Sequence, residues 1–192
     1  MNKLILGTNN KHKIKEITEI FQQIYPNIEI NTIDPNDDAP EKELSFNQNA
    51  YLKAKYYYNK YKLPILTDDS GICVEALNNR PGVLSKRYSN TGLDLDNNLK
   101  MLEEMKDKEN RKAFYNCSIC LYINDELFYL FEGQLHGKIN YELKGTNGFG
   151  YDSLFYLDEY QKNVAEIDEK IKNELSHRRN ALNKMKEYLL KE

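Results

Sequence analysis

Two adjacent acidic residues, Asp68 and Asp69, interrupt an apolar stretch near the middle of the chain. The flanking segments 64–66 and 72–74 are typical of a buried strand. An ionised carboxylate in apolar surroundings costs several kcal/mol unless a partner compensates it, and two neighbouring carboxylates also repel each other. Two interpretations stay open. Asp-Asp-Ser-Gly favours a turn that ends the strand, or the pair faces a divalent cation that neutralises both acids.

The size and composition of the chain allow a substantial core. It has 192 residues, of which 40% are hydrophobic and 15 are tyrosines, which fits one domain, 1–192, in two lobes. No apolar run is long enough to cross a membrane, and the N-terminal apolar stretch is too short for a signal peptide. The net charge of −3 argues against a general nucleic-acid binder. We therefore expect a cytoplasmic protein that binds neither membranes nor nucleic acid.

The cysteines are interpreted as core residues. Cys117 and Cys120 form a C-x-x-C motif, but Cys73 is the only other cysteine, so the second pair of a zinc site is missing. Residues three apart in a strand point to opposite faces of the sheet. We therefore expect three buried thiols and no metal bound to them.

Helix and strand signals alternate in the first half of the chain, and a strand-rich region follows. The predicted helices cover 14–24, 45–62, the segment with Leu95, Leu99, Leu102 and Met105, and a last segment from about Ser176 that buries Ala181, Leu182, Met185 and Leu189. Ser45 and Gln48 have the spacing of a capping box at the start of the second helix. The predicted strands cover 3–7, 28–33, the acidic segment, 112–123 and 126–132, the last two as an antiparallel hairpin. This order predicts an α/β fold in which helices flank a mixed, twisted sheet.

Two of the predicted helices begin in basic sequence. The loop 8–13 contains Lys11 and Lys13, and the free N–H groups and partial positive charge of a helix start favour phosphate. His177, Arg178 and Arg179 open the last helix, where cations oppose the helix dipole by about 0.3–1 kcal/mol each. An anion or a polar ligand edge would offset that cost. The alternative for both segments is an ordinary solvated basic surface.

A glycine-rich turn at 145–150 surrounds Phe149. Glycines let the backbone approach a ligand closely, and an exposed aromatic ring between them is a stacking surface for a base. The alternative is a hairpin turn with a buried aromatic ring. Glu41 adds a third carboxylate to the acidic pair, and Mg²⁺ prefers carboxylates together with phosphate oxygens. These features together indicate a site for a metal and a nucleotide.

A series of segments, in order along the chain, resembles the inosine triphosphate pyrophosphatase family. They are T-N-N-K-H-K-I-K-E at 8–16, E-K-E-L-S-F-N-Q-N-A-Y-L-K-A at 41–54, T-D-D-S-G-I-C-V-E-A-L at 67–77, P-G-V-L-S-K-R-Y at 81–88, G-T-N-G-F-G-Y-D at 145–152 and K-N-E-L-S-H-R at 172–178. The resemblance implies hydrolysis of ITP, dITP and XTP to the monophosphate and pyrophosphate. It also implies Mg²⁺, a substrate cleft between two lobes, and a homodimer.

The resemblance further implies roles for the matching residues. Asp69 would place or deprotonate the attacking water as the catalytic base, and Glu41 and Asp69 would bind the metal. Phe149 would stack on the purine, whose edge Asp152, Lys172, His177 and Arg178 would read or orient. The substrate-binding residues implied are Thr8, Asn9, Asn10, Lys11, His12, Lys13, Lys53, Ser70, Phe149, Gly150, Tyr151, Asp152, Lys172, His177 and Arg178.

Some positions depart from the family pattern. Gln48 stands where Glu is common, so it is not counted as a metal ligand, and Lys86 weakens a role for Arg87. Two alternatives stay open: a relative that prefers modified pyrimidines or dinucleotides, and a silent nucleotide sensor or nucleic-acid-binding module that would lack the metal pair. If the acidic segment is extended, Asp68 and Asp69 point to opposite faces and have different roles.

Overall fold

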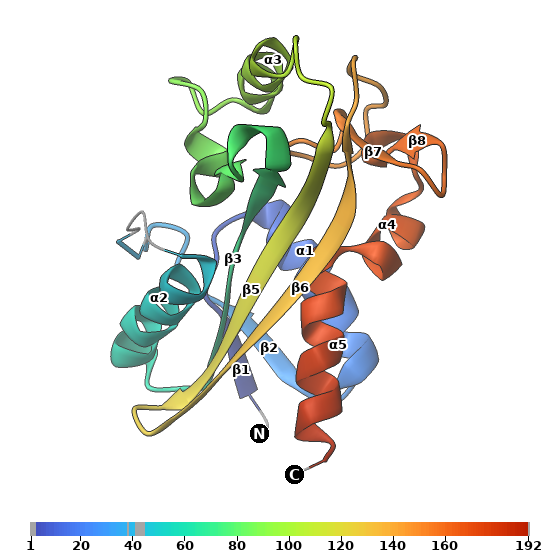
Figure 1. Cartoon of the computed structure of the whole chain (residues 1–192). Coiled ribbons are helices and arrows are strands. Elements are labelled where there is room, and N and C mark those ends of the chain that lie inside the picture. The colour runs from blue at the N-terminus through green and yellow to red at the C-terminus, as the bar shows by residue number, and fades with distance from the viewer. Residues whose placement is uncertain (1–2, 38, 41–44, 192) are drawn as a thin grey trace. The chain divides into compact units, whose positions relative to one another are not determined.

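The computed structural model describes residues 3–37, 39–40 and 45–191, in which helices flank a mixed sheet (Figure 1). The strands are β1 (Lys3–Leu6), β2 (Glu29–Thr32), β3 (Ile65–Val74), β4 (Arg80–Pro81), β5 (Lys112–Asn124), β6 (Leu127–Ile139), β7 (Phe155–Leu157) and β8 (Lys162–Asn163). The α-helices are α1 (Lys11–Ile24), α2 (Phe46–Tyr61), α3 (Asp94–Glu104), α4 (Glu169–Leu175) and α5 (His177–Leu189). The short 3-10 helices are η1 (Glu75–Leu77), η2 (Gly82–Arg87) and η3 (Val164–Glu166).

The sheet is mixed, as predicted. Its strand order is β2-β1-β3-β5-β6-β7-β8, and β4 pairs with β3. β1 is parallel to both β2 and β3, whereas the pairs β3–β4, β6–β7 and β7–β8 are antiparallel. A two-residue turn at 125–126 joins β5 and β6, which confirms the predicted hairpin, although β6 continues beyond residue 132 to Ile139.

The chain divides into two compact units, each with its own hydrophobic core. Unit 1 comprises Met1–Asp69, Cys117–Gly133 and His177–Glu192, and unit 2 comprises Ser70–Asn116 and Gln134–Ser176. One boundary therefore falls inside β3, directly after the acidic pair.

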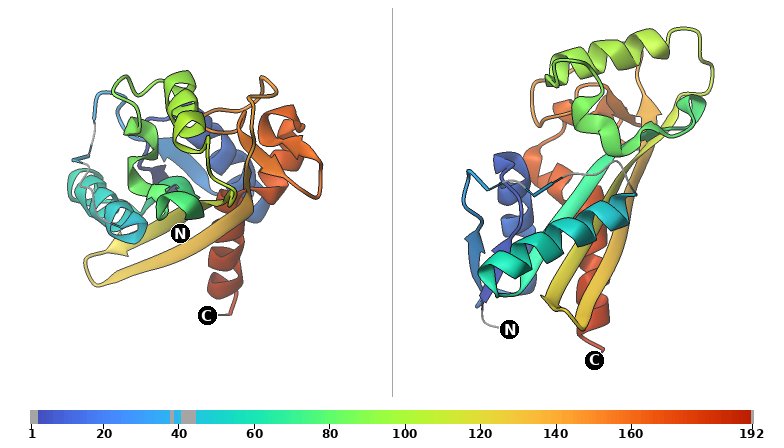
Figure 2. Two further views of the ribbon diagram at one scale, coloured as in Figure 1. Left: turned by 45° about the horizontal axis from the view of Figure 1, so that its top comes forward. Right: turned by 90° about the vertical axis from the view of Figure 1, so that its left-hand side faces the viewer.

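In unit 1, alternate residues of each strand face two different layers of helices. Leu66 and Ile119 pack with α1 and α5, whereas Ile65 and Tyr122 pack with α2. Figures 1 and 2 show α2 on one side of these strands and α5 on the other. The period of two along a strand thus decides which helix each side chain meets.

The core of unit 2 gathers side chains from β3, α3, β5 and the segment after β6. On α3 the leucines that predict the helix are not its buried face, because Leu95 and Leu99 are 59% and 50% exposed. Asn97, Asn98 and Met101 are buried instead. The two asparagines are compensated by hydrogen bonds to backbone groups of neighbouring segments.

The acidic segment is extended throughout, so the interpretation of Asp-Asp-Ser-Gly as a turn is wrong. β3 runs unbroken from Ile65 to Val74. Gly71 serves close packing rather than a turn, because a Cβ atom there would lie 2.3 Å from the Gly82 carbonyl oxygen and 2.4 Å from Ser85 Oγ. The signal that suggested a turn is therefore a signal for η2 approaching the strand.

Other local predictions have definite outcomes. The capping box at Ser45 and Gln48 starts α2 as predicted, and the last helix begins directly after Ser176. The helix α4 was not predicted. All three cysteines are free and buried, as expected, and burial raises the pKa of Cys73 to about 11 and of Cys120 to about 12. In the described part of the chain, no helix has both the length and the apolar character needed to span a membrane.

Gly133 on β6 lets the start of α5 approach the strand, and we predict that Gly133→Ala destabilises the protein. A Cβ atom would lie 2.2 Å from the His177 carbonyl oxygen and 2.3 Å from the Ala181 nitrogen. Overpacking against backbone typically costs about 1–3 kcal/mol or more, measured here by urea unfolding.

Gly82→Ala is the control, because its Cβ meets nothing within 4 Å and the cost is confined to the left-handed φ, about 1–2 kcal/mol. A Gly133→Ala protein as stable as the wild type would show that α5 does not need this close approach.

Candidate active site

The alternation of β3 sends the two acidic side chains to different helices of unit 1, as an extended segment predicts. Asp68 forms an ion pair with Lys13 Nζ of α1 at 3.0 Å, and it accepts a hydrogen bond from Arg178 Nε of α5 at 3.2 Å. Asp69 lies on the α2 side, where Lys53 Nζ is 3.0 Å from Oδ1 and Asn49 Nδ2 is 3.1 Å from Oδ2. The two carboxylates therefore have separate partners.

Asp68 is held in its ionised form. Its side chain is 1% exposed. Burial by itself raises the pKa of this carboxyl, but the charges of Lys13, Arg178 and Lys53 outweigh burial and hold the pKa well below its usual range. A carboxylate that is this acidic and this inaccessible is a poor proton acceptor near neutral pH.

Arg178 connects Asp68 to α1. The guanidinium is 1% exposed and also pairs through Nη1 with Glu16 Oε2. Burial lowers the pKa of Arg178, but the charges of Glu16 and Asp68 outweigh this and raise it. The anion expected near the basic start of α5 is, for Arg178, supplied by two carboxylates of the protein itself.

The acidic side chains around β3 are paired with basic side chains. The acids are Glu16, Asp68 and Asp69, and the bases that pair with them are Lys13, Lys53 and Arg178. Because each carboxylate already has a cationic partner, the acidic pair does not require a metal ion for its own stability. Any case for a metal must come from unused oxygen atoms.

Some oxygen atoms are in fact unused. Asp68 Oδ1 and Asn49 Oδ1 are buried and accept no hydrogen bond, and both are the type of ligand that Mg²⁺ prefers. Of the predicted metal ligands, Asp69 lies beside Asn49, whereas Asp68 faces the other side of β3 and Glu41 falls outside the described residues. Within the described residues, no three His, Cys, Asp or Glu side chains gather as a metal site. Among the described residues, the oxygen donors on this side of β3 are those of Asp69 and Asn49, and both are ligand types that suit magnesium.

The predicted phosphate loop forms the start of α1. Asn10 is the N-cap, and its Oδ1 accepts hydrogen bonds from the backbone nitrogens of His12 and Lys13 at 3.0 and 3.2 Å. Two of the amides expected to face a phosphate are thus occupied by the cap. Thr8 Oγ1 accepts from the Asn10 nitrogen.

The remaining predicted residues of unit 1 differ in exposure. Asn9 donates to the Asp37 carbonyl oxygen at 2.8 Å, Lys11 and His12 are exposed, and His177 is buried at the start of α5.

In unit 2, the glycine-rich turn and α4 build a second cluster around Asp152. Its Oδ2 accepts from Phe149 N at 2.9 Å and from Lys172 Nζ at 2.8 Å, and its Oδ1 accepts from the Tyr115 hydroxyl at 3.2 Å. Lys172 Nζ also lies 4.5 Å from the centre of the Phe149 ring, within range of a cation–π interaction. Asp152 therefore holds both Lys172 and the backbone of Phe149 in place.

Two further predicted residues belong to unit 2. Tyr151 directly precedes Asp152, and Ser70 is the first residue of the unit. The Tyr151 hydroxyl donates to the Ser85 carbonyl oxygen at 2.8 Å, so this side chain belongs to the core rather than to an open surface. Ser70 is half-buried on β3.

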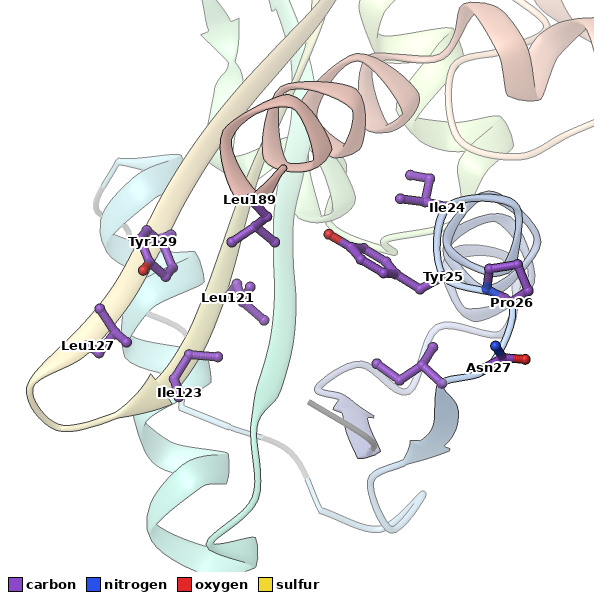
Figure 3. Close-up of a pocket in the computed structure, with 10 residues that line it drawn as sticks. Ile24, Tyr25, Pro26, Asn27, Leu121, Ile123, Leu127, Tyr129 and Leu189 are labelled. Atoms are coloured by element: carbon purple, nitrogen blue, oxygen red, sulfur yellow. The ribbon is translucent and has the colours of Figure 1, made fainter. Parts of the chain in front are cut away.

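Unit 1 also has a pocket of about 580 Å³, which is lined by none of the predicted site residues (Figure 3). Its lining is largely apolar, and Figure 3 shows Tyr25, Leu121 and Leu189 directed toward one another. It contains no charged side chain. A triphosphate needs cations to neutralise it, so this pocket is not the candidate active site.

The sequence model of the Ham1 family matches residues 4–188. The chain belongs to the Ham1 family. A dITP/XTP pyrophosphatase of Clostridium tetani is 42% identical over 98% of this chain and 96% of its own length. A dITP/XTP pyrophosphatase of Legionella pneumophila is 41% identical over 98% of this chain and 99% of its own length.

Solved structures of Ham1 proteins have the same fold. The Ham1 protein of Staphylococcus aureus has a TM-score of 0.88 and 32% identity, covering 97% of both chains. A Ham1 protein from Coxiella burnetii has a TM-score of 0.88 and 34% identity, covering 100% of both chains. The predicted resemblance and the predicted α/β fold are thereby confirmed.

Sequence reasoning missed several residues of these clusters. Asn49 lies one helical turn before Lys53, and Glu16 lies three residues after Lys13, so each shares a helix face with a residue that was predicted. That spacing was the available signal. Tyr115 carries no such signal, because only tertiary structure brings it to Asp152.

We predict that Asp68 contributes stability that acid removes. Its pKa is lower in the folded than in the unfolded chain, so the contribution is complete above about pH 4 and is lost as pH falls further. Asp68→Asn should lose roughly 3–5 kcal/mol at pH 7, because Lys13 and Arg178 are left buried without it, and its stability should depend less on pH below about 4.

Urea unfolding between pH 7 and pH 3 measures both effects. Glu29→Gln is the matched control, since Glu29 pairs with Lys3 on the surface and exposed pairs contribute about 0–1 kcal/mol. Equal acid sensitivity in wild type and Asp68→Asn would contradict the prediction.

Proposed function

We propose that this protein hydrolyses non-standard purine nucleoside triphosphates, ITP, dITP and XTP, to the monophosphate and pyrophosphate. The observation that carries the proposal is the lysine-rich acidic cluster at β3, found in a Ham1 chain whose relatives are named dITP/XTP pyrophosphatases. Such an activity removes damaged nucleotides from the pool. By the family resemblance, we also propose a single two-lobed domain, a homodimer and a cytoplasmic location.

Asp69 is the proposed general base. Its side chain is 12% exposed, against 1% for Asp68, so a water molecule can reach Asp69 more readily. Lys53 and Asn49 orient the carboxylate from one side. A base positioned in this way typically contributes about 10²–10⁴-fold to the rate. Asp68, in this proposal, stays ionised and fixes Lys13 and Arg178.

The triphosphate is assigned to residues of unit 1. Lys13, Lys53, Thr8 and Asn10 supply charge and polar contacts, because a polyanion repels an approaching nucleophile until its charge is neutralised. Magnesium held by Asp69 and Glu41 would supply further positive charge at the phosphate oxygens. Lys13 and Lys53 already pair with Asp68 and Asp69, so we propose that they are shared between these acids and the substrate.

The purine is assigned to the cluster around Asp152. Phe149 stacks on the base, and Lys172 presents a donor to its edge, with Asp152 holding Lys172 in place. For His177, a role at the purine edge stays a prediction from the family resemblance. Donors aimed at a 6-oxo group are left unpaired opposite a 6-amino group, and such mismatches discriminate strongly. Arg178 was also predicted to read the base. Its contacts in this structure are with Glu16 and Asp68, and base recognition by Arg178 remains a prediction.

The experiment that tests this function is pyrophosphate release from ITP, XTP, GTP, ATP and dUTP, with and without Mg²⁺. We expect ITP and XTP to be preferred and EDTA to abolish turnover, because the charge on the triphosphate is then uncompensated. Equal rates on ATP and ITP would refute the specificity. Preference for dUTP would instead favour the pyrimidine alternative.

We predict that Asp69→Asn binds ITP but loses at least about 10²-fold in kcat, because an amide cannot accept the proton of the attacking water. Binding is measured by calorimetry with Mg²⁺ and turnover by pyrophosphate release. Asp107→Asn, which changes an exposed acid in unit 2, controls for the loss of one negative charge. Full activity in Asp69→Asn would remove this residue as the base.

A further inference from the structure

Side chains in the first turns of α3 form hydrogen bonds with Gly150 of the glycine-rich turn. Asp94 Oδ2 accepts a hydrogen bond from the Gly150 nitrogen at 2.6 Å, and Asn98 Nδ2 donates to the Gly150 carbonyl oxygen at 2.7 Å. Both polar groups of this residue are therefore bound by side chains one helical turn apart. All of these residues belong to unit 2.

The composition of α3 indicates that these contacts matter for how the helix packs. Asn98 is 2% exposed, while Leu95 and Leu99 face solvent. Asn98 Nδ2 also donates a hydrogen bond to the Asp94 carbonyl oxygen at 2.7 Å, whereas Asn98 Oδ1 is buried and accepts no hydrogen bond. Burying an asparagine with an unused acceptor is unfavourable, so packing alone does not account for this residue. The bond to Gly150 does.

The segment held by this contact is rich in glycine and has much conformational freedom to lose on ordering. Gly145, Gly148 and Gly150 all have positive φ angles, of 81°, 79° and 63°, and glycine has the largest conformational freedom to lose on ordering. Phe149 lies between two of them. On its other side, its backbone nitrogen donates to Asp152. The contacts to Asp152 and to α3 therefore bracket Phe149 and fix the peptide planes on both sides of it.

We propose that Asp94 and Asn98 are positioning residues for base recognition: they hold Gly150 so that the Phe149 ring is presented in one orientation before the substrate arrives. This inference rests on the proposed function, in which Phe149 stacks on the purine. A loop that is ordered beforehand does not have to be ordered by the ligand, and affinity improves by that amount. This gain in affinity concerns the base of the substrate and not its triphosphate.

The kinetic test compares Asn98→Ala and Asp94→Ala with wild type. We expect the KM for ITP to rise about 3- to 20-fold, the range of one or two lost hydrogen bonds, while kcat changes less than about 2-fold because the chemistry is carried by other residues. The inhibition constant of tripolyphosphate, which has no base, should stay unchanged. A rise in both KM and the tripolyphosphate constant would indicate general disruption and overturn the proposal.

Conservative variants sharpen the test. Asp94→Asn keeps a carbonyl oxygen that accepts from Gly150 and should restore a near-normal KM. Asn98→Asp has the same shape but places an acceptor against two carbonyl oxygens, so it should be worse than Asn98→Ala. Asp96→Asn removes a neighbouring acid of the same helical turn, one that accepts from Thr91 rather than from Gly150, and should leave the KM unchanged. A KM raised equally by Asp96→Asn would overturn the proposal.

Amide hydrogen exchange provides a readout that does not depend on activity. In the wild type, the Gly150 amide should be protected, and Asp94→Ala should increase its exchange at least about 5-fold, the loss expected from one hydrogen bond. Unchanged exchange would show that Asp94 does not hold this residue. If the wild type fails to hydrolyse ITP, the proposed function is refuted, and the exchange experiment still decides whether α3 orders the turn.

Discussion

The pairing of the buried Asp68 carboxylate with Lys13 and Arg178 is the interaction around which unit 1 is arranged. Asp68 lies on a central strand, and its partners come from α1 and α5, which are far apart in the sequence. An unpaired charge at that depth would be strongly destabilising, so the two helices must be placed so that Lys13 and Arg178 reach it. Asp68 alone cannot neutralise two cations, and Glu16 balances the positive charge of Arg178.

The same strand gives its two acidic residues different surroundings. Asp68 faces the layer of α1 and α5, where it is enclosed and remains ionised, and Asp69 faces α2, where Asn49 and Lys53 leave it partly accessible. Adjacent residues of one type thereby acquire different surroundings through the period of two in a strand. In unit 2, Asp152 has a comparable organising role, because it fixes Lys172 and the backbone of Phe149 together.

Much of the fold was predictable from local signals, and the failures have physical reasons. The capping box at Ser45, the apolar periodicity of α1 and α5, and the hairpin of β5 and β6 were all correctly predicted. Gly71 misled the prediction, because glycine marks a turn and a close approach of two segments equally well. The exposed leucines of α3 show that periodicity identifies a helix without identifying its buried face.

The sequence by itself determined the family, the order of the longer helices and strands, and the acidic and basic residue types available near β3. It also required Asp68 and Asp69 to face opposite sides once their segment was extended. Only the tertiary structure decided that Lys13, Arg178 and Lys53 compensate these acids, and that α3 binds the turn beside Phe149. Pairing depends on distances between residues that are remote in the chain, and no local pattern encodes those distances.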